Sequence, residues 1–365
     1  MSDSSNSDPK NLDLPRLSVL GQDHSGLFDA ESAGTTQADP SDTSTSQEAH
    51  IPFADHPGFS QVFTPGKLTF GLIAPFKGYR NTPVPNVDDL AELAQGAEDA
   101  GFSALWLRDV PFLDRGFGDV GQGYDPIVTL GYLAAKTSSI ALGTAGIVTT
   151  LREPIHVAKA AATVDALTNG RMLLGLSTGD RPSEFPAFNA GFENRGERFR
   201  EAWELIDTLI KNPTSPSFAG EHYGQLSGEL EFIPQLDHRV PMVSIGRARQ
   251  EFSWLANRAD AWIWHGVNPR DTKNIVDMLA RLNTNHTWHP FGYANFVDVS
   301  DDPNEPATLH NNIFLRGGTR ELAKFWKEQK EQGLAHVTLN LKPTKRSMES
   351  VYDEFATNVL EVVNG

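Results

Sequence analysis

The 365-residue chain contains no cysteine. This absence excludes disulfides, thiolate metal ligands, iron–sulfur clusters and cysteine nucleophiles, so any catalysis must use other groups or a cofactor. Long apolar runs are also missing, since none approaches the roughly 18 uncharged apolar residues that a membrane-spanning helix needs. The N-terminal sequence MSDSSNSDPKNLDLPRLSVL lacks the basic segment and apolar stretch of a secretory signal. We therefore expect a cytoplasmic protein that does not bind membranes.

Positive charge is scarce, because 31 Lys and Arg against 47 Asp and Glu give a net charge of -16. Nucleic-acid binding requires Lys and Arg to neutralise phosphates, so no nucleic-acid partner is expected. Residues 1–60 hold ten acidic residues and two basic ones, which is half of the net charge. Residues 1–52 are also rich in Ser, Thr, Asp and Gly. They predict a disordered acidic tail, because they offer too little apolar surface to offset the ordering entropy.

From Leu68 onward, short apolar runs alternate with helical stretches, which predicts parallel strands joined by crossover helices. Eight such pairs favour closure, so the predicted fold is α/β, a single (β/α)8 TIM barrel with insertions over residues 53–365. The predicted strands are Leu68–Phe76, Ser103–Asp109, Ile140–Thr149, Arg171–Thr178, Pro241–Gly246, Ala261–His265, Gly292–Val299 and Ala335–Leu341. The helices are predicted to begin near Val87, Asp125, Glu153, Arg198, Gln250, Asp271, Thr319 and Ser347.

Two irregular stretches interrupt this alternation. Residues 212–235 indicate a β excursion, and residues 300–318 are polar and acidic before a short apolar segment. Long insertions in a compact domain either build a site or form surface excursions, so each stretch is a candidate lid over the barrel mouth.

Chemistry in this fold comes from strand ends and the loops that follow them. Small residues at such ends let a flat ligand lie close to the backbone. Free amides and arginines that precede a helix favour a phosphate. The strand ends carry Ala74, Asp109, Ala145, Gly146, Ser177, Thr178, Gly179, Gly246, Arg247, Ala248, Arg249 and His265.

The segment GTAGIVTTLREPIHVAKAAATVDALTNGRMLLGLSTGDRPSEFPAFN, followed by NRGERFREAWELIDTLIK, resembles the luciferase-like flavin monooxygenase family. Weaker similarity extends from about Phe53 to the end of the chain. The resemblance implies a flavin-dependent oxidoreductase, with a monooxygenase as the first interpretation. Such an enzyme would act on a small organic substrate with O2 and reduced FMN, which a separate flavin reductase would supply. The family also leads us to expect a homodimer.

The resemblance also implies roles for individual residues. Ala145 and Gly146 match the family's non-prolyl cis peptide beneath the flavin ring. Ser177 and Thr178 match positions that flank the flavin, where luciferases have Cys and Arg. The segment Arg247–Arg249 matches the stretch that approaches the flavin phosphate, and His265 matches an active-site position. Ala74, Gly179 and Gly246 are assigned to cofactor binding on their places at strand ends.

The catalytic histidine that luciferases carry after the second strand is missing, since this chain reads Arg108, Asp109, Val110 and Pro111 there. Light emission from a long-chain aldehyde is therefore not expected. Asp109 and His265 remain as candidate acid–base groups. Asp109 has an alternative structural role, paired with Arg108 or Arg181. His265 has one as a histidine that closes the barrel beside Trp264.

Two other functions stay open. Relatives with the same barrel use the deazaflavin F420 for hydride transfer, and a non-catalytic flavin-binding protein is also compatible with the altered residues. No metal site is expected, because His286 and His289 lack an evident third ligand. Arg195, Arg198 and Glu201 are interpreted as an ion-paired helix start. Asp165 is expected to be structural and distant from the mouth.

Overall fold

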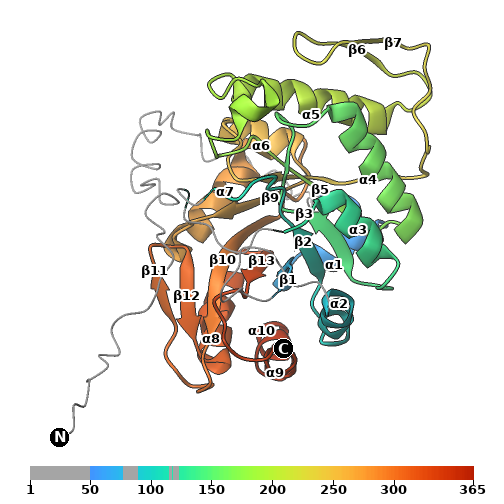
Figure 1. Ribbon diagram of the computed structural model, residues 1–365. Helices are drawn as coiled ribbons and strands as arrows, with labels where there is room; N and C mark the ends of the chain where they lie inside the picture. The colour runs from blue at the N-terminus through green and yellow to red at the C-terminus, as the bar shows by residue number, and fades with distance from the viewer. Residues whose placement is uncertain (1–49, 77–88, 115–116, 118–122) are drawn as a thin grey trace, which may run out of the picture.

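A closed barrel of eight parallel strands forms the centre of the computed structural model, which describes residues 50–76, 89–114, 117 and 123–365 (Figure 1). The pairings run β10–β13–β1–β2–β3–β5–β8–β9 and return to β10, so the predicted TIM barrel is confirmed. The barrel strands are β1 (Thr69–Ala74), β2 (Ala104–Leu107), β3 (Ala141–Thr144), β5 (Met172–Ser177), β8 (Met242–Ile245), β9 (Ala261–His265), β10 (Phe291–Val299) and β13 (His336–Asn340).

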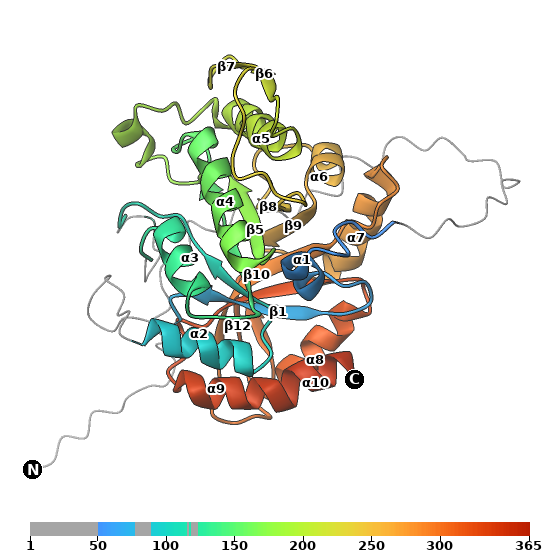
Figure 2. The ribbon, with the colours of Figure 1, turned by 90° about the vertical axis from the view of Figure 1, so that its right-hand side faces the viewer.

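Helices follow the strands in the predicted alternation and cover the outside of the barrel (Figures 1 and 2). The predicted helix start at Val87 lies outside the described residues, and α2 begins at Leu90. The helices are α1 (Pro57–Val62), α2 (Leu90–Asp99), α3 (Pro126–Ala134), α4 (Pro154–Thr168), α5 (Arg195–Lys211), α6 (Phe252–Arg258), α7 (Thr272–Leu282), α8 (Thr319–Lys330), α9 (Met348–Phe355) and α10 (Glu361–Asn364).

The third predicted strand is interrupted. In place of one strand over Ile140–Thr149, the structure has β3 and the short β4 (Ile147–Val148), separated by a cis peptide bond between Ala145 and Gly146. β3 pairs with β2 and β5, whereas β4 pairs only with the end of β5. The predicted strand was thus too long, and its break lies at the carboxyl end of the barrel.

Both insertions form β structure. Residues 212–235 contain the hairpin β6 (Ser217–Ala219) and β7 (Gln225–Ser227), which projects beyond α5 as predicted (Figure 1). Residues 300–318 form β11 (Thr308–His310) and β12 (Phe314–Gly317), and β12 extends the sheet by pairing with β10. A lid function for either insertion stays a prediction.

The amino-terminal part of the described chain covers the end of the barrel at which the strands begin. The buried side chains Phe59, Val62 and Phe63, from α1 and its end, belong to the same core cluster as the barrel's inward residues. His50 forms a parallel bridge with Thr287, although the sequence placed it in the tail. Residues 1–49 lie outside the described residues. Among the described residues, no helix is long and apolar enough to cross a membrane.

Trp106 fills the middle of the barrel and fixes the tautomer of a buried histidine. A Cβ on Gly71 or Gly143 would lie within 2.6 Å or 2.4 Å of the indole, so these positions admit only glycine. The indole N–H donates to Nε2 of His336 over 3.0 Å. Nδ1 of His336 therefore carries the proton and faces the Thr69 hydroxyl at 2.8 Å. Burial lowers the pKa of His336 to about 3, so its ring stays neutral.

This buried neutral histidine predicts a loss of stability in mild acid. An unfolded histidine titrates near pH 6.5, so below that pH the unfolded chain binds a proton that folded His336 refuses. The free energy of unfolding should fall by about 1.4 kcal/mol per pH unit for each such histidine. Burial also lowers the pKa of His289 to about 4, which adds a second contribution of the same sign.

Urea unfolding at pH 6 and pH 5 measures the effect. His336→Gln should lower the stability at pH 7 but remove about half of this histidine-linked pH dependence. His310→Gln, at an exposed histidine on β11, is the control and should leave the dependence unchanged. An unchanged pH dependence in His336→Gln would contradict the assignment of a neutral His336 in the folded protein.

Candidate active site

The mouth of the barrel lies at the carboxyl ends of the strands. Leu173 and Ile263 belong to the inner core, and Ala145 packs against it. Alternate residues of a strand face the same side, so Ser177 and His265 also point toward the barrel interior. Ala74 instead belongs to the outer core and lines a small cleft with Pro75 and Arg108. The structure therefore brings Ala145, Ser177 and His265 to one opening but turns the side chain of Ala74 away from it.

The Ala145–Gly146 peptide bond is cis, as the resemblance predicted. Ser177 lies against it, since its hydroxyl donates to the carbonyls of Gly146 and Ile147 over 3.3 Å and 3.4 Å. A Cβ on Gly146 would lie 2.8 Å from Ile245 and 3.0 Å from the Leu176 backbone, so the close approach of these strands requires glycine. Residues 145–148 and 177–179 thus form one continuous surface.

A second set of bonds joins the same two loops. The Thr149 amide donates to the Ser177 carbonyl over 3.2 Å, and the Thr150 hydroxyl donates to the carbonyl of Thr178 over 2.8 Å. Gly179 follows with a positive φ of 77°. These bonds hold the backbone of Ser177 and Thr178 against the segment after β4.

Asp109 is the anchor of the segment after the cis bond. Its carboxylate accepts two bonds from Arg152, of 2.8 Å and 2.7 Å, and one of 3.0 Å from the Val148 amide. Arg152 also bonds Asp125, which caps α3 by accepting the amides of Ile127 and Val128. Asp109 is 7 % exposed, and its hydrogen bond raises the pKa of Arg152.

The structure thus favours the structural alternative for Asp109, with Arg152 as its partner. The sequence had suggested Arg108 or Arg181. The carboxylate already accepts three hydrogen bonds from a fixed cation and an amide, which suits it to hold a loop. A role as a proton carrier stays a prediction.

The loop after β8 is the third wall of the mouth. Gly246, Ala248 and Arg249 have positive φ values of 69°, 49° and 54°. A Cβ on Gly246 would meet nothing within 4 Å, so open space adjoins the backbone there. Arg247 lies over the Phe252 ring at the start of α6. The helix begins two residues later than predicted.

The loops on β3/β4, β5 and β8 are neighbours, because these strands are adjacent in the barrel. They carry all of the predicted cofactor residues except Ala74. Asp109 and His265 follow β2 and β9, which lie on opposite sides of the closed barrel. The structure therefore does not bring the two predicted acid–base residues together. Leu105 and Leu107 of β2 belong to the outer core, so the same alternation turns Asp109 toward Arg152 rather than into the barrel interior.

Glu184 is a candidate that the sequence analysis missed. It lies in the loop after β5, is 5 % exposed, and has its Oε1 atom 3.7 Å from Arg181. Burial raises the pKa of its carboxyl above the usual range, and nearby Asp180 adds to the effect. Perturbed carboxyls at a barrel mouth are functional candidates. In the sequence, Glu184 stands only as a Glu before the segment Phe185–Phe188. Such a pattern is also typical of a surface turn.

The predicted ion-paired start of α5 is wrong. Glu201 accepts hydrogen bonds from the backbone amides of Glu221, His222 and Tyr223, and so holds the β6–β7 hairpin. Within the described ranges, neither Arg195 nor Arg198 forms an ion pair with a carboxylate. The helix starts at Arg195, three residues earlier than expected. The exposed turn amides of the hairpin outcompete the arginines for Glu201.

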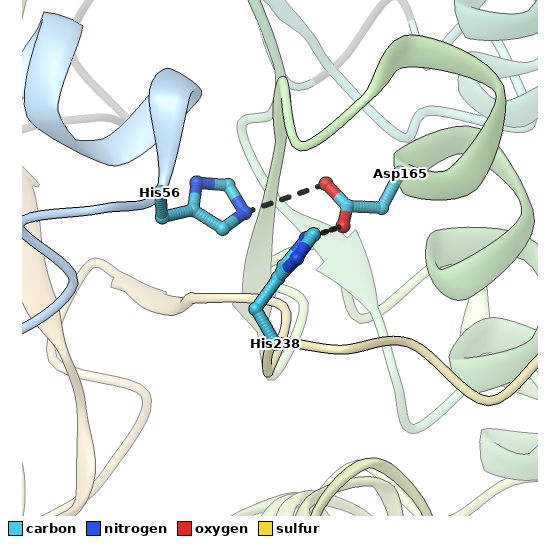
Figure 3. A group of neighbouring side chains, drawn as sticks. All are labelled: His56, Asp165 and His238. Atoms are coloured by element: carbon cyan, nitrogen blue, oxygen red, sulfur yellow. Dashed lines mark hydrogen bonds and ion pairs between the residues drawn. The ribbon is translucent and has the colours of Figure 1, made fainter.

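His56, Asp165 and His238 cluster at the opposite end of the barrel (Figure 3). The Asp165 carboxylate lies 3.4 Å from Nε2 of His56 and 2.6 Å from Nε2 of His238, and it accepts the Met172 amide over 3.0 Å. Burial raises the Asp165 pKa, but the hydrogen bonds of the two histidines and Met172 outweigh it and lower the pKa. The cluster links the start of α1, the end of α4 and the coil before β8.

The ligand atoms of this cluster lie close enough for a metal ion, but the tautomer of His56 opposes one. Nδ1 of His56 accepts the Phe59 amide over 3.1 Å, so the neutral ring carries its proton on Nε2. A metal would need the lone pair of that Nε2 atom. Asp165 therefore serves as the acceptor for two imidazoles, in the structural position expected from the sequence.

The model of the family described as luciferase-like monooxygenase matches residues 68–348. The chain belongs to this family. The match covers the whole barrel except the end of the last βα unit, and so includes every wall of the mouth described above.

Proteins similar to this chain include an F420-dependent dehydrogenase and a monooxygenase subunit. An F420-dependent glucose-6-phosphate dehydrogenase of Kineococcus radiotolerans is 38% identical over 138 residues, which are 37% of this chain and 40% of that protein. The alkanal monooxygenase beta chain of Photorhabdus luminescens is 32% identical over 157 residues, 43% of this chain and 47% of that protein. The matches thus span less than half the length of these two relatives.

A solved structure of an F420-dependent secondary alcohol dehydrogenase, in complex with an F420-acetone adduct, has the same fold. It superposes with a TM-score of 0.67 at 18% identity, covering 81% of this chain and 99% of that one. At this identity the likeness shows the fold alone. The chain thus combines a family match over the barrel with the fold of this structure.

Proposed function

We propose that the protein is an F420-dependent oxidoreductase that transfers a hydride between the deazaflavin and a small organic substrate. The observation that carries the proposal is the arc of small residues at the barrel mouth, Ala145, Gly146 and Gly179, which packs against Ser177. The similarity to F420-dependent dehydrogenases supports this cofactor over FMN.

The residues of the arc fit a flat tricyclic ring. Ala145, Gly146 and Gly179 present little side-chain bulk, and the space beside Gly246 has room for a ligand. In the proposal, residues 145–146 and 177–179 hold the ring of the cofactor, and the loop 246–249 holds the phosphate of the cofactor side chain. When bound, the deazaflavin accepts or donates the hydride. The barrel orients the substrate and excludes water from it.

His265 is the better of the two predicted acid–base residues. Its side chain is exposed at the end of β9 and shares the inward face with Ile263. Asp109 is held by Arg152 and the Val148 amide. In the proposal, His265 takes or gives the substrate proton, and Asp109 positions the segment under the ring.

A monooxygenase that uses reduced FMN, O2 and a separate flavin reductase is the second candidate, because the chain is also similar to an alkanal monooxygenase subunit. The substrate in either case is a small organic molecule. Neither a membrane nor a nucleic acid is part of the proposal.

Anaerobic titration with F420 and FMN, each oxidised and reduced, tests the proposal through cofactor fluorescence and absorbance. We expect F420 to bind at least about tenfold more tightly than FMN, because the dehydrogenases similar to this chain depend on F420. Tighter binding of reduced FMN, with oxygen uptake on admitting air, would shift the function to the monooxygenase. Binding without turnover of any alcohol or aldehyde tried would favour a non-catalytic flavin-binding protein, and no binding would contradict the proposal.

We extend the proposal to a homodimer through α3. This helix is apolar on nearly all sides. Val128 and Tyr132 in the helix are 74% and 46% exposed, and Tyr124, two residues before its start, is 48% exposed. Apolar side chains that are exposed next to one another mark a surface for contact with another protein.

Sedimentation velocity measures the assembly. The wild-type protein should have the mass of a dimer, and Val128→Asp should have that of a monomer with an unchanged circular dichroism spectrum. Glu92→Lys on the exposed face of α2 is a matched surface control and should remain dimeric. A wild-type monomer at all concentrations would contradict this part of the proposal.

A further inference from the structure

Three arginines gather where α5 meets the loop after β8. Arg195 and Arg198 lie one turn apart on the first turns of α5, which places them on one side of the helix. Gly196 lies between them and packs against Arg249, since a Cβ there would be 3.1 Å from the Cβ of Arg249. The missing side chain at Gly196 lets the loop after β8 lie directly on α5.

Gln250 fixes this contact. Its amide nitrogen donates to the carbonyls of Gly196 and Ala248 over 2.9 Å and 3.0 Å, and its oxygen accepts two bonds from Arg200. Gln250 is 1 % exposed. The positions of Arg195 and Arg249 relative to each other are therefore set by a buried side chain.

The guanidinium groups are held on aromatic rings and carbonyls. Arg195 lies 3.5 Å from the centre of the Phe192 ring and donates to the Phe192 carbonyl over 2.6 Å. Arg198 lies 5.0 Å from the centre of the Tyr223 ring. The Nε atoms of both arginines are buried and form no hydrogen bond within the described part of the chain. Such N–H groups without an acceptor can donate hydrogen bonds to a ligand.

The charges of Arg195 and Arg249 repel each other and are only partly compensated by carboxylates. Burial lowers the pKa of Arg195, and the charge of Arg249 lowers it further, against a smaller opposite effect of Glu193 and Asp180. A concentration of positive charge is unexpected in a chain of net charge -16. Like charges held together by the fold are most easily explained by an anionic ligand that separates them.

The three arginines adjoin the proposed cofactor arc. The Phe192 ring contacts Phe185, and a Cβ on Gly179 would lie 3.3 Å from Phe185. On the other side, the Tyr223 hydroxyl donates to the Thr149 carbonyl over 3.2 Å. The β6–β7 insertion thus brings Tyr223, and with it Arg198, to the edge of the mouth.

We propose that Arg195, Arg198 and Arg249 form an oxyanion-binding site on the rim, which takes an acidic group on the outer part of the cofactor side chain. The inference rests on the proposed function for the identity of the ligand. Phosphate and carboxylate share the chemistry that the site recognises, since both accept charge-assisted bonds from guanidinium groups.

Binding of paired compounds tests the site and separates the two sources of the oxyanion. The pairs are F420 with its side-chain-shortened alcohol, which lacks phosphate and carboxylates, and FMN with riboflavin, which lacks only the phosphate. Arg195→Gln and Arg198→Gln should each weaken the acidic member of a pair at least about tenfold and leave its neutral partner unchanged. A loss for FMN identifies a phosphate, and a loss for F420 alone identifies the carboxylates.

Two variants control for structure. Arg195→Lys keeps the charge and should recover part of the affinity, and Arg281→Gln on the exposed end of α7 should change nothing. High salt should reduce the advantage of the acidic compounds. Equal losses for acidic and neutral compounds, or no loss, would overturn the site while leaving the cofactor assignment intact.

Inorganic pyrophosphate tests the site without any cofactor. It should raise the Tm of the wild-type protein by several degrees and that of the doubly substituted Arg195→Gln, Arg198→Gln protein by less than one. If neither F420, FMN nor their neutral partners bind, the proposed function fails. The pyrophosphate measurement then tests the oxyanion site independently of the cofactor. An equal shift, or none, in both proteins would overturn it.

Discussion

The ion pair between Asp109 and Arg152 is the constraint on which the mouth of this barrel depends. It joins the end of β2 to the segment after β4, and through Asp125 to the cap of α3. The third bond of Asp109, from the Val148 amide, fixes the backbone two residues beyond the cis peptide. Because the pair is bidentate and the carboxylate is buried, it sets orientation as well as distance.

The other contacts of the mouth build on this segment. Ser177 and Thr178 bond to its carbonyls and hydroxyls, and Tyr223 approaches it from the insertion. Gln250 joins the loop after β8 to α5. A cofactor on this arc would rest on backbone that is held from several sides, and precise positioning is what a hydride-transfer enzyme must supply.

Much of the fold was predictable from the sequence, because apolar runs of strand length alternate with helical periodicity. Each predicted barrel strand exists, and only the third is broken, between Thr144 and Ile147. The cis bond and the grouping of Ser177 with Gly146 followed from the family resemblance. Composition and periodicity alone do not report either feature.

The rest could not be predicted, because it depends on contacts between distant segments. Asp109 and Arg152 are 43 positions apart, and only the barrel order shows that they meet. Glu201 has two arginines within helical reach, yet it binds the hairpin turn 20 to 22 residues away. The burial of Glu184 likewise follows from loop packing after β5. Charge spacing along α5 therefore misassigned Glu201.

A double-mutant cycle on cofactor affinity tests the role of the Asp109–Arg152 pair most directly. The dissociation constant of the preferred cofactor would be measured for the wild type, Asp109→Asn, Arg152→Gln and the double variant. We predict that each single change weakens binding and that the double change adds little, with a coupling of about 0.5–3 kcal/mol. Unchanged affinity in Asp109→Asn, with turnover abolished, would contradict the account and restore Asp109 as a proton carrier.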